Sequence, residues 1–96
     1  MNFEWDKSKE EGNLRKHGVP FEQAIIAFDD PFGIVRLDLT HSAWEMRERL
    51  LGESDIGLLS VIFTIRKPKN ILRIISARPA KRKERKHYEE SKGYIF

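Results

Sequence analysis

The stretch from Asn70 to Lys92 reads NILRIISARPAKRKERKHYEESK, and it joins the two kinds of segment that decide the fold. Its first part, Ile71 to Ile75, is apolar and rich in β-branched residues, which predicts a buried strand. The second part is cationic, because residues 66–87 contain ten Lys or Arg residues and a single acid, Glu84. The chain therefore passes from a buried strand directly into concentrated positive charge.

We expect the cationic segment to be a helix that includes Arg78. Arg78, Arg82 and Arg85 then lie on one stripe, at positions i, i+4 and i+7. Three aligned guanidinium groups suit phosphate oxygens, and an anionic partner would relieve a repulsion of about 0.2 to 0.5 kcal/mol per pair. The alternative is a solvated helix face, which is what most charge runs are.

Charge is divided unequally along the chain. Residues 1–65 hold seven bases and twelve acids, a net charge of −5, whereas residues 66–96 hold eleven bases and three acids, a net charge of +8. Such polarity predicts association with nucleic acid or with an acidic protein.

The length of 96 residues, without repeats or Gly/Ser linkers, predicts a single domain over residues 1–96. The chain lacks cysteine, and the spacing of His17, His41 and His87 is not that of zinc ligands, so we expect no metal and no cofactor. The N-terminus is charged from its fourth residue, and no run approaches the ~20 apolar residues of a membrane span. We therefore expect a cytoplasmic protein without membrane association.

Two helices are predicted in the N-terminal third of the chain. A short strand over residues 2–5 precedes a helix from about Lys7 to His17, which Asp6 caps and which ends at Gly18 in a left-handed conformation. Pro20 suits the first position of a second helix, whose apolar residues recur at helical spacing.

The chain between that second helix and the basic segment predicts strands. They are expected at residues 34–39, 44–50, 59–65 and 71–77, with a polar turn at residues 52–57. The last three should follow one another as an antiparallel meander. Together with a basic C-terminal helix, these elements make an α+β fold.

Both ends of the sequence resemble signatures of the BrnT toxins. The N-terminal signature is similar to FEWDKSKEEGNLRKHGVPFEQA, through Trp5, Asp6, Lys9, Asn13, Lys16, His17, Gly18, Val19, Phe21 and Ala24. The C-terminal signature is similar to IISARPAKRKERKHYEE, through Ile75, Ser76, Arg78, Ala80, Arg82, Glu84, Arg85 and Tyr88. Asp29, Asp30, Pro31 and Gly52 also stand where the family has them, while Pro20 replaces a frequent Ser.

The resemblance implies a ribonuclease toxin of a type II toxin-antitoxin pair with a RelE-like fold. It implies RNA as the substrate and a BrnA-like antitoxin as the partner. That antitoxin would carry a ribbon-helix-helix DNA-binding region, so operator DNA would be bound only through it.

Metal-free cleavage of RNA needs a base for the 2'-OH, an acid for the leaving 5'-oxygen, and cations for the charge on the phosphorane. Arg78 and Arg82 are the leading candidates for the cations, and Lys16, at the end of the first predicted helix, is a further catalytic candidate. His17 has the best intrinsic pKa for the base, ~6.5, but at a helix end beside Lys16 it is more often a cap. Glu84 is the other candidate, although neighbouring cations should lower its pKa.

Further residues are candidates for binding RNA or for purely structural roles. Arg73, Lys81, Arg85 and Tyr88 are the RNA-binding candidates, although Tyr88 can instead close the core. Glu84 is expected to pair with the side chain of Lys81 or Lys83. One alternative function is a non-catalytic module that binds nucleic acid or an acidic partner through the same helix. Another is a metal-dependent nuclease using Asp29 and Asp30, although adjacent acids at a helix end are more typical of turns.

Overall fold

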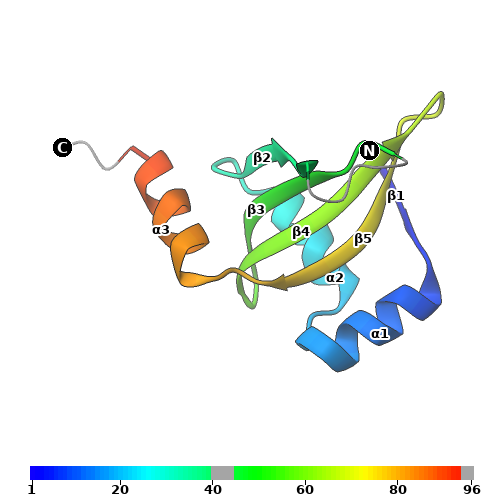
Figure 1. The fold of residues 1–96 in the computed structure, drawn as a ribbon, viewed down its shortest axis with the longest axis horizontal. Helices are drawn as coiled ribbons and strands as arrows, with labels where there is room; N and C mark the ends of the chain where they lie inside the picture. The colour runs from blue at the N-terminus through cyan, green and yellow to red at the C-terminus, as the bar shows by residue number, and fades with distance from the viewer. Residues whose placement is uncertain (40–44, 94–96) are drawn as a thin grey trace.

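The computed structural model describes residues 1–39 and 45–93. Its elements are, in order, β1 (Asn2–Trp5), α1 (Lys7–His17), α2 (Phe21–Phe28), β2 (Ile34–Leu37), β3 (Glu48–Ser54), β4 (Gly57–Arg66), β5 (Ile71–Pro79) and α3 (Arg82–Ser91). The five strands form a sheet in the order β1-β5-β4-β3-β2. Helix α2 lies behind this sheet, α1 lies along the β5 side, and α3 lies beyond one end (Figure 1). The predicted α+β class is confirmed.

The sheet is mixed rather than wholly antiparallel. Strands β2 to β5 pair in sequence order as an antiparallel meander, as predicted for the last three of them. Strand β1 instead runs parallel to β5, with Asn2 opposite Ile71 and Trp5 opposite Ile74. Parallel neighbours need a long connection, and here the chain from α1 to β4 provides it.

Three predicted boundaries in the first two thirds of the chain need correction or fall outside the described residues. Gly52 lies within β3, not in a turn, because α2 rests on the strand there and a Cβ on Gly52 would clash with the carbonyl oxygen of Ala27. Pro20 is the N-cap of α2 rather than its first residue, with an extended ψ of 147°. Trp44, the predicted start of a strand, lies outside the described residues.

Arg78 lies on a strand, so the prediction that it belongs to the basic helix is wrong. Strand β5 continues to Pro79, and α3 begins only at Arg82. The residue before a proline is disfavoured in the α region by a clash with the proline ring, so Arg78 stays extended. Arg78 therefore shares no helical stripe with Arg82 and Arg85.

A bulge in β5 decides which face of the sheet Arg78 occupies. Ile75 is an extra residue between two cross-strand pairs, Phe63 with Ile74 and Ile62 with Ser76. Ile74 faces α2 before the bulge and Ala77 faces α2 after it. Side chains alternate along a regular strand, so in an unbulged strand of this sequence Arg78 would share the face of Ile74 and point into the core. The bulge turns it to the opposite face.

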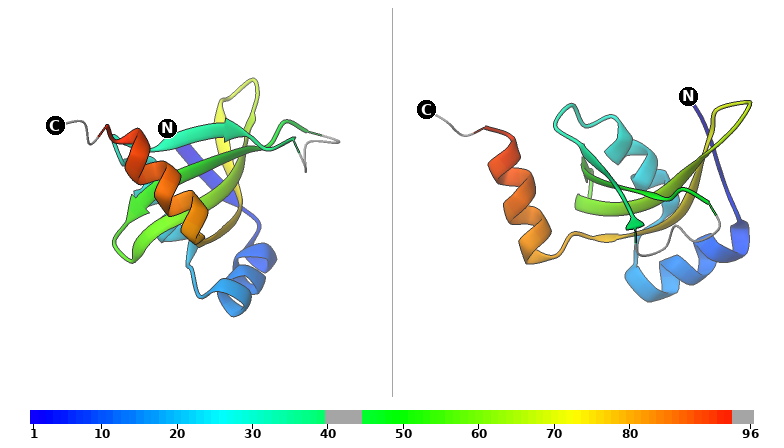
Figure 2. Two further views of the ribbon diagram at one scale, coloured as in Figure 1. Left: turned by 60° about the vertical axis from the view of Figure 1, so that its left-hand side comes forward. Right: turned by 45° about the horizontal axis from the view of Figure 1, so that its top comes forward.

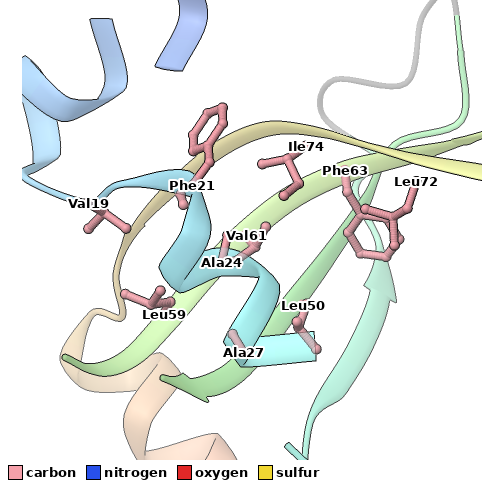
Figure 3. Packing of buried hydrophobic residues seen from close by; sticks show 11 residues of the cluster. Val19, Phe21, Ala24, Ala27, Leu50, Leu59, Val61, Phe63, Leu72 and Ile74 are labelled. Atoms are coloured by element: carbon pink, nitrogen blue, oxygen red, sulfur yellow. The ribbon is translucent and has the colours of Figure 1, made fainter. Parts of the chain in front are cut away.

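The main core lies between α2 and the sheet (Figure 3). Its buried residues are Val19, Phe21, Ala24, Ala27, Leu50, Leu59, Val61, Phe63, Leu72, Ile74 and Ala77. A smaller cluster lies on the other face, where Tyr88 of α3 packs with Leu51 and Leu58. Helix α3 extends beyond the end of β5, away from α1 (Figure 2).

The side-chain amide of Asn13 holds α1 against β5. Its Nδ2 donates to the carbonyl oxygens of Ala77 (2.8 Å) and Val19 (3.0 Å), and its Oδ1 accepts from the Ala77 N–H (3.0 Å). Because the pairing with β1 ends at Ile74, Asn13 takes the place of a strand neighbour at Ala77. Asn13 is buried, so its amide satisfies backbone groups that water reaches poorly.

Replacing Asn13 with Ala should lower the free energy of unfolding by about 2 to 4 kcal/mol, because the N–H and carbonyl groups of Ala77 lose their partner at about 1 to 3 kcal/mol each. Urea denaturation measures this loss. The exposed Glu11 on the same helix is the control, and Glu11→Ala should change stability by less than about 0.5 kcal/mol. A loss for Asn13→Ala no larger than that of the control would show that solvent satisfies Ala77.

Candidate active site

The sheet face opposite α2 carries a pocket of about 390 Å³. Its lining residues come from the end of α1, from β3 to β5 and their flanks, and from the segment before α3: Lys16, His17, Arg47, Arg49, Ser60, Ile62, Ile75, Ser76, Arg78 and Lys81. Five of these side chains are Lys or Arg and none is a carboxylate. The pocket is therefore a site for anions.

Arg49 reaches the pocket because side chains alternate along β3. Leu50 packs into the core against α2, so its neighbour Arg49 faces the other way. The Arg49 Nη1 donates to the hydroxyl of Ser60 on β4 and lies 3.4 Å from an oxygen of Glu84. Arg49 is thus held on both sides, with its side chain still 30% exposed.

Arg78 and Glu84 form a bidentate pair at the mouth of the pocket. The Nη1 and Nη2 atoms of Arg78 donate to the two carboxylate oxygens of Glu84 at 2.7 and 2.9 Å. Glu84 also accepts from the backbone N–H of Lys81 at 2.8 Å, which caps α3. The predicted pairing of Glu84 with the side chain of Lys81 or Lys83 is wrong, because a residue at the third position of a helix reaches back over its N-terminus, here toward β5.

Glu84 is ionised in this setting. Burial alone would raise its pKa, but the hydrogen bonds from Arg78 and from the Lys81 N–H, with the charges of Arg78 and Arg49, outweigh burial and hold the pKa below its usual value. A carboxylate with a lowered pKa is a poor proton acceptor at neutral pH. The Glu84 carboxylate is instead suited to holding the guanidinium groups of Arg78 and Arg49 in fixed positions.

His17 lies at the C-terminal end of α1, which Gly18 closes in a left-handed conformation with φ of 70°. Its ring lines the same pocket as Arg78. Burial, followed by the charges of Lys16 and Arg78, lowers the pKa of His17 below its ordinary value. The imidazole is therefore neutral at neutral pH and can accept a proton.

The other predicted site residues lie outside this pocket, except for Lys16 and Lys81, which are part of its lining. Arg82 and Arg85 are exposed on α3. Arg73 lies on the far half of β5 and donates to Glu4 at 2.8 Å. Tyr88 is 1% exposed, and its hydroxyl donates to Asp30. This position matches the alternative in which Tyr88 closes the core, and its ring is too buried to stack on a nucleobase.

The paired acids at the end of α2 have structural positions. Asp29 is the C-cap of α2, and Asp30 accepts from the N–H groups of Phe32 and Glu53 at 2.9 and 2.8 Å as well as from Tyr88. Burial would raise the pKa of Asp30, but these hydrogen bonds keep it low. Within residues 1–39 and 45–93, no three His, Asp or Glu side chains are grouped so as to hold a metal ion. Over the same ranges, no helix has the length and apolar character needed to cross a membrane.

Arg47, Arg49 and Ser60 are pocket residues that the sequence analysis does not select. A signal for the two arginines exists, because alternation with Glu48 and Leu50 places them on one side of a half-buried strand. The sequence does not identify that side as functional, because it does not show that β5 places Arg78 on the same side. Ser60 carries no signal of its own within an otherwise apolar strand.

Comparison with known families adds an independent assignment. A family model described as a ribonuclease toxin, BrnT, of type II toxin-antitoxin systems matches residues 5–84. That span contains every residue that lines the pocket, together with Glu84. No curated protein sequence matches the chain. Because the family match covers most of its length, the chain belongs to the BrnT family of ribonuclease toxins, which act in pairs with an antitoxin.

Proposed function

We propose that this toxin cleaves RNA without a metal ion, by attack of a ribose 2'-OH on the adjacent phosphate. The observation that carries this proposal is the meeting of two guanidinium groups, Arg78 and Arg49, with a neutral His17 at one pocket. A pocket lined by five cationic side chains attracts phosphate and repels a divalent cation. The products would carry 2',3'-cyclic phosphate and 5'-hydroxyl ends.

In this mechanism His17 accepts the proton of the 2'-OH as the oxygen forms its bond to phosphorus. The P–O5' bond then breaks, and Lys16, another residue of the pocket lining, gives a proton to the leaving oxygen. Arg78 and Arg49 stabilise the additional negative charge of the phosphorane. The proton removed from the 2'-oxygen is thereby balanced by the proton delivered to the 5'-oxygen.

We assign Glu84 a positioning role rather than that of the base. Guanidinium groups have five N–H donors, and the Glu84 carboxylate engages two of those on Arg78. Arg78 is thus aligned before RNA arrives, which reduces the ordering needed in the transition state. Arg82, Arg85 and Lys81 extend the positive surface from the pocket along α3 and would bind the phosphates of the flanking RNA.

The proposal also includes the partner and the setting. A BrnA-like antitoxin with a ribbon-helix-helix region would inhibit the enzyme, and the pair would bind operator DNA through that antitoxin alone. A RelE-like fold, with a sheet whose open face binds RNA, is consistent with the position of the pocket opposite α2. The RNA substrate is cytoplasmic, and so is the proposed site of action.

Replacing Arg78 with Ala should lower kcat/KM for RNA cleavage by about 10² to 10³-fold, as expected for loss of a donor to the transition state. Arg78→Lys keeps the charge but loses the two-pronged geometry, so it should recover only a minor part of the activity. Arg82→Ala is the matched control outside the pocket and should lower kcat/KM by less than about tenfold, mainly through KM. Equal losses in Arg78→Ala and Arg82→Ala would contradict the assignment of the pocket.

The dependence of kcat/KM on pH should have an acid limb set by His17. Because the pKa of His17 is lowered, the imidazole takes up a proton only below its ordinary value of 6.5, and activity should fall as pH decreases through that lowered pKa. His17→Gln should remove the limb and lower activity by about 10² to 10⁴-fold. The exposed His87, on α3, is the control, and a limb that persists in His17→Gln would assign the base elsewhere.

Cleavage should persist in EDTA and should leave 2',3'-cyclic phosphate, which mass spectrometry of a short RNA product detects. Products with a 5'-phosphate, or activity restored by Mg²⁺ alone, would establish the metal-dependent alternative. A protein that shifts RNA on a gel but leaves it intact would establish the alternative of a non-catalytic binding module.

A further inference from the structure

A second hollow, on the α2 side of the sheet, has a chemical character opposite to that of the active site. This groove has a volume of about 550 Å³ and is lined by Met1, Phe3, Ile25, Phe28, Asp29, Val35, Glu48, Phe63, Ile65 and Leu72. Eight of the ten side chains are apolar and the other two are acids. Its lining shares no residue with the basic pocket.

The groove exists because α2 is too short to cover its face of the sheet. An α-helix of eight residues is about 12 Å long, whereas a strand of ten residues such as β4 spans about 33 Å. Beyond the end of α2, the buried core residues Phe63 and Leu72 and the partly buried Ile65 therefore form the floor of an open hollow.

The groove reaches the outer edge of the sheet at Val35 of β2. Strand β2 is last in the sheet order, so no described strand pairs with its outer side. Val35 is 50% exposed, and the apolar side chains of Leu37 and Leu39 continue the exposed line along this edge. An unpaired strand edge beside an apolar groove is the arrangement that accepts an additional strand from another polypeptide.

Charge restricts what can occupy this groove. Its polar lining consists of the carboxylates of Asp29 and Glu48, which would repel the phosphates of RNA. A second copy of this chain using the same edge would bring two acid-lined grooves together, since a twofold interface places the same patch on both sides. A partner with apolar side chains flanked by Lys or Arg is not repelled in this way, because its apolar side chains fit the groove and its cations attract the two carboxylates.

We propose that the antitoxin docks on this face, through an extended apolar segment with basic flanking residues. The segment pairs with the outer edge of β2 as a sixth strand, inserts apolar side chains beside Val35 and Phe28, and places a Lys or Arg near Asp29 and Glu48. This inference rests on the proposed toxin-antitoxin function, and it deepens that function by assigning the docking surface to the face away from the RNA pocket.

The test is the affinity of the intact toxin for the purified antitoxin encoded beside its gene, measured by calorimetry without RNA. Val35→Glu adds a carboxylate to the acid-lined groove and should raise Kd by at least about tenfold. Ile56→Glu is the matched control, because Ile56 is 54% exposed in the turn between β3 and β4 and does not line the groove.

Asp29→Lys should raise Kd about threefold or more and make the affinity less sensitive to salt. A lysine at this helix C-cap is compatible with the helix dipole, so the fold should tolerate it.

RNA cleavage by Val35→Glu without antitoxin should equal that of the parent, and antitoxin should protect RNA from this variant only at correspondingly higher concentration. A Kd for Val35→Glu equal to that of the parent overturns the inference, as does an equal loss in Ile56→Glu. A free toxin that sediments as a dimer, and as a monomer after Val35→Glu, would identify a second copy as the occupant and also overturn it. Since binding is measured without RNA, a parent toxin that binds antitoxin but cuts no RNA would contradict the proposed reaction and leave this result standing.

Discussion

The hydrogen bonds between the Asn13 amide and the backbone of Ala77 are the constraint on which the candidate active site depends. They are the contacts that tie α1 to β5 where the parallel neighbour β1 has already ended. On a helix, residues four apart share one face, so fixing Asn13 on β5 also directs His17 toward that strand. The same amide donates to Val19 and thereby fixes the connection to α2. One buried side chain therefore orients the proposed base relative to the sheet.

The segment of β5 after Ile74 makes two kinds of contact, one at its edge and one on its face. At its edge, Ala77 receives Asn13, and on its face Arg78 enters the pocket. Both depend on the bulge at Ile75, because it interrupts the alternation of a regular strand so that small Ala77 packs in the core and Arg78 does not. Pro79 then keeps the strand extended until the chain turns into α3. Arg78 and Glu84, which are six positions apart in the sequence, face each other across that turn.

The sequence predicts the parts of this structure that local chemistry determines. Asp6 accepts from the Lys9 N–H and Gly18 ends α1 in the left-handed conformation, as a cap and a stop signal indicate. The prediction fails for Arg78, because charge density suggests a helix while one proline and one bulge keep the residue in a strand. It fails for Glu84 as well, because the sequence suggests Lys81 or Lys83 as its partner, whereas its partners in space are arginines from two strands. Such pairings depend on strand register, which hydrophobic pattern alone does not determine.

The charge polarity of the sequence is not the charge polarity of the folded protein. Three of the five cations in the pocket, Lys16, Arg47 and Arg49, come from the acidic part of the chain, residues 1–65. The fold therefore brings cations from both parts of the chain into one pocket. Lys and Arg side chains gather on the face opposite α2, whereas the acids Asp29 and Glu48 border the apolar groove beside α2.

A single layer of strands thus separates a surface suited to polyanions from one suited to an apolar and basic polypeptide. In the proposed function, RNA binds the first surface and the antitoxin the second, and the charge that lines each hollow repels the ligand of the other.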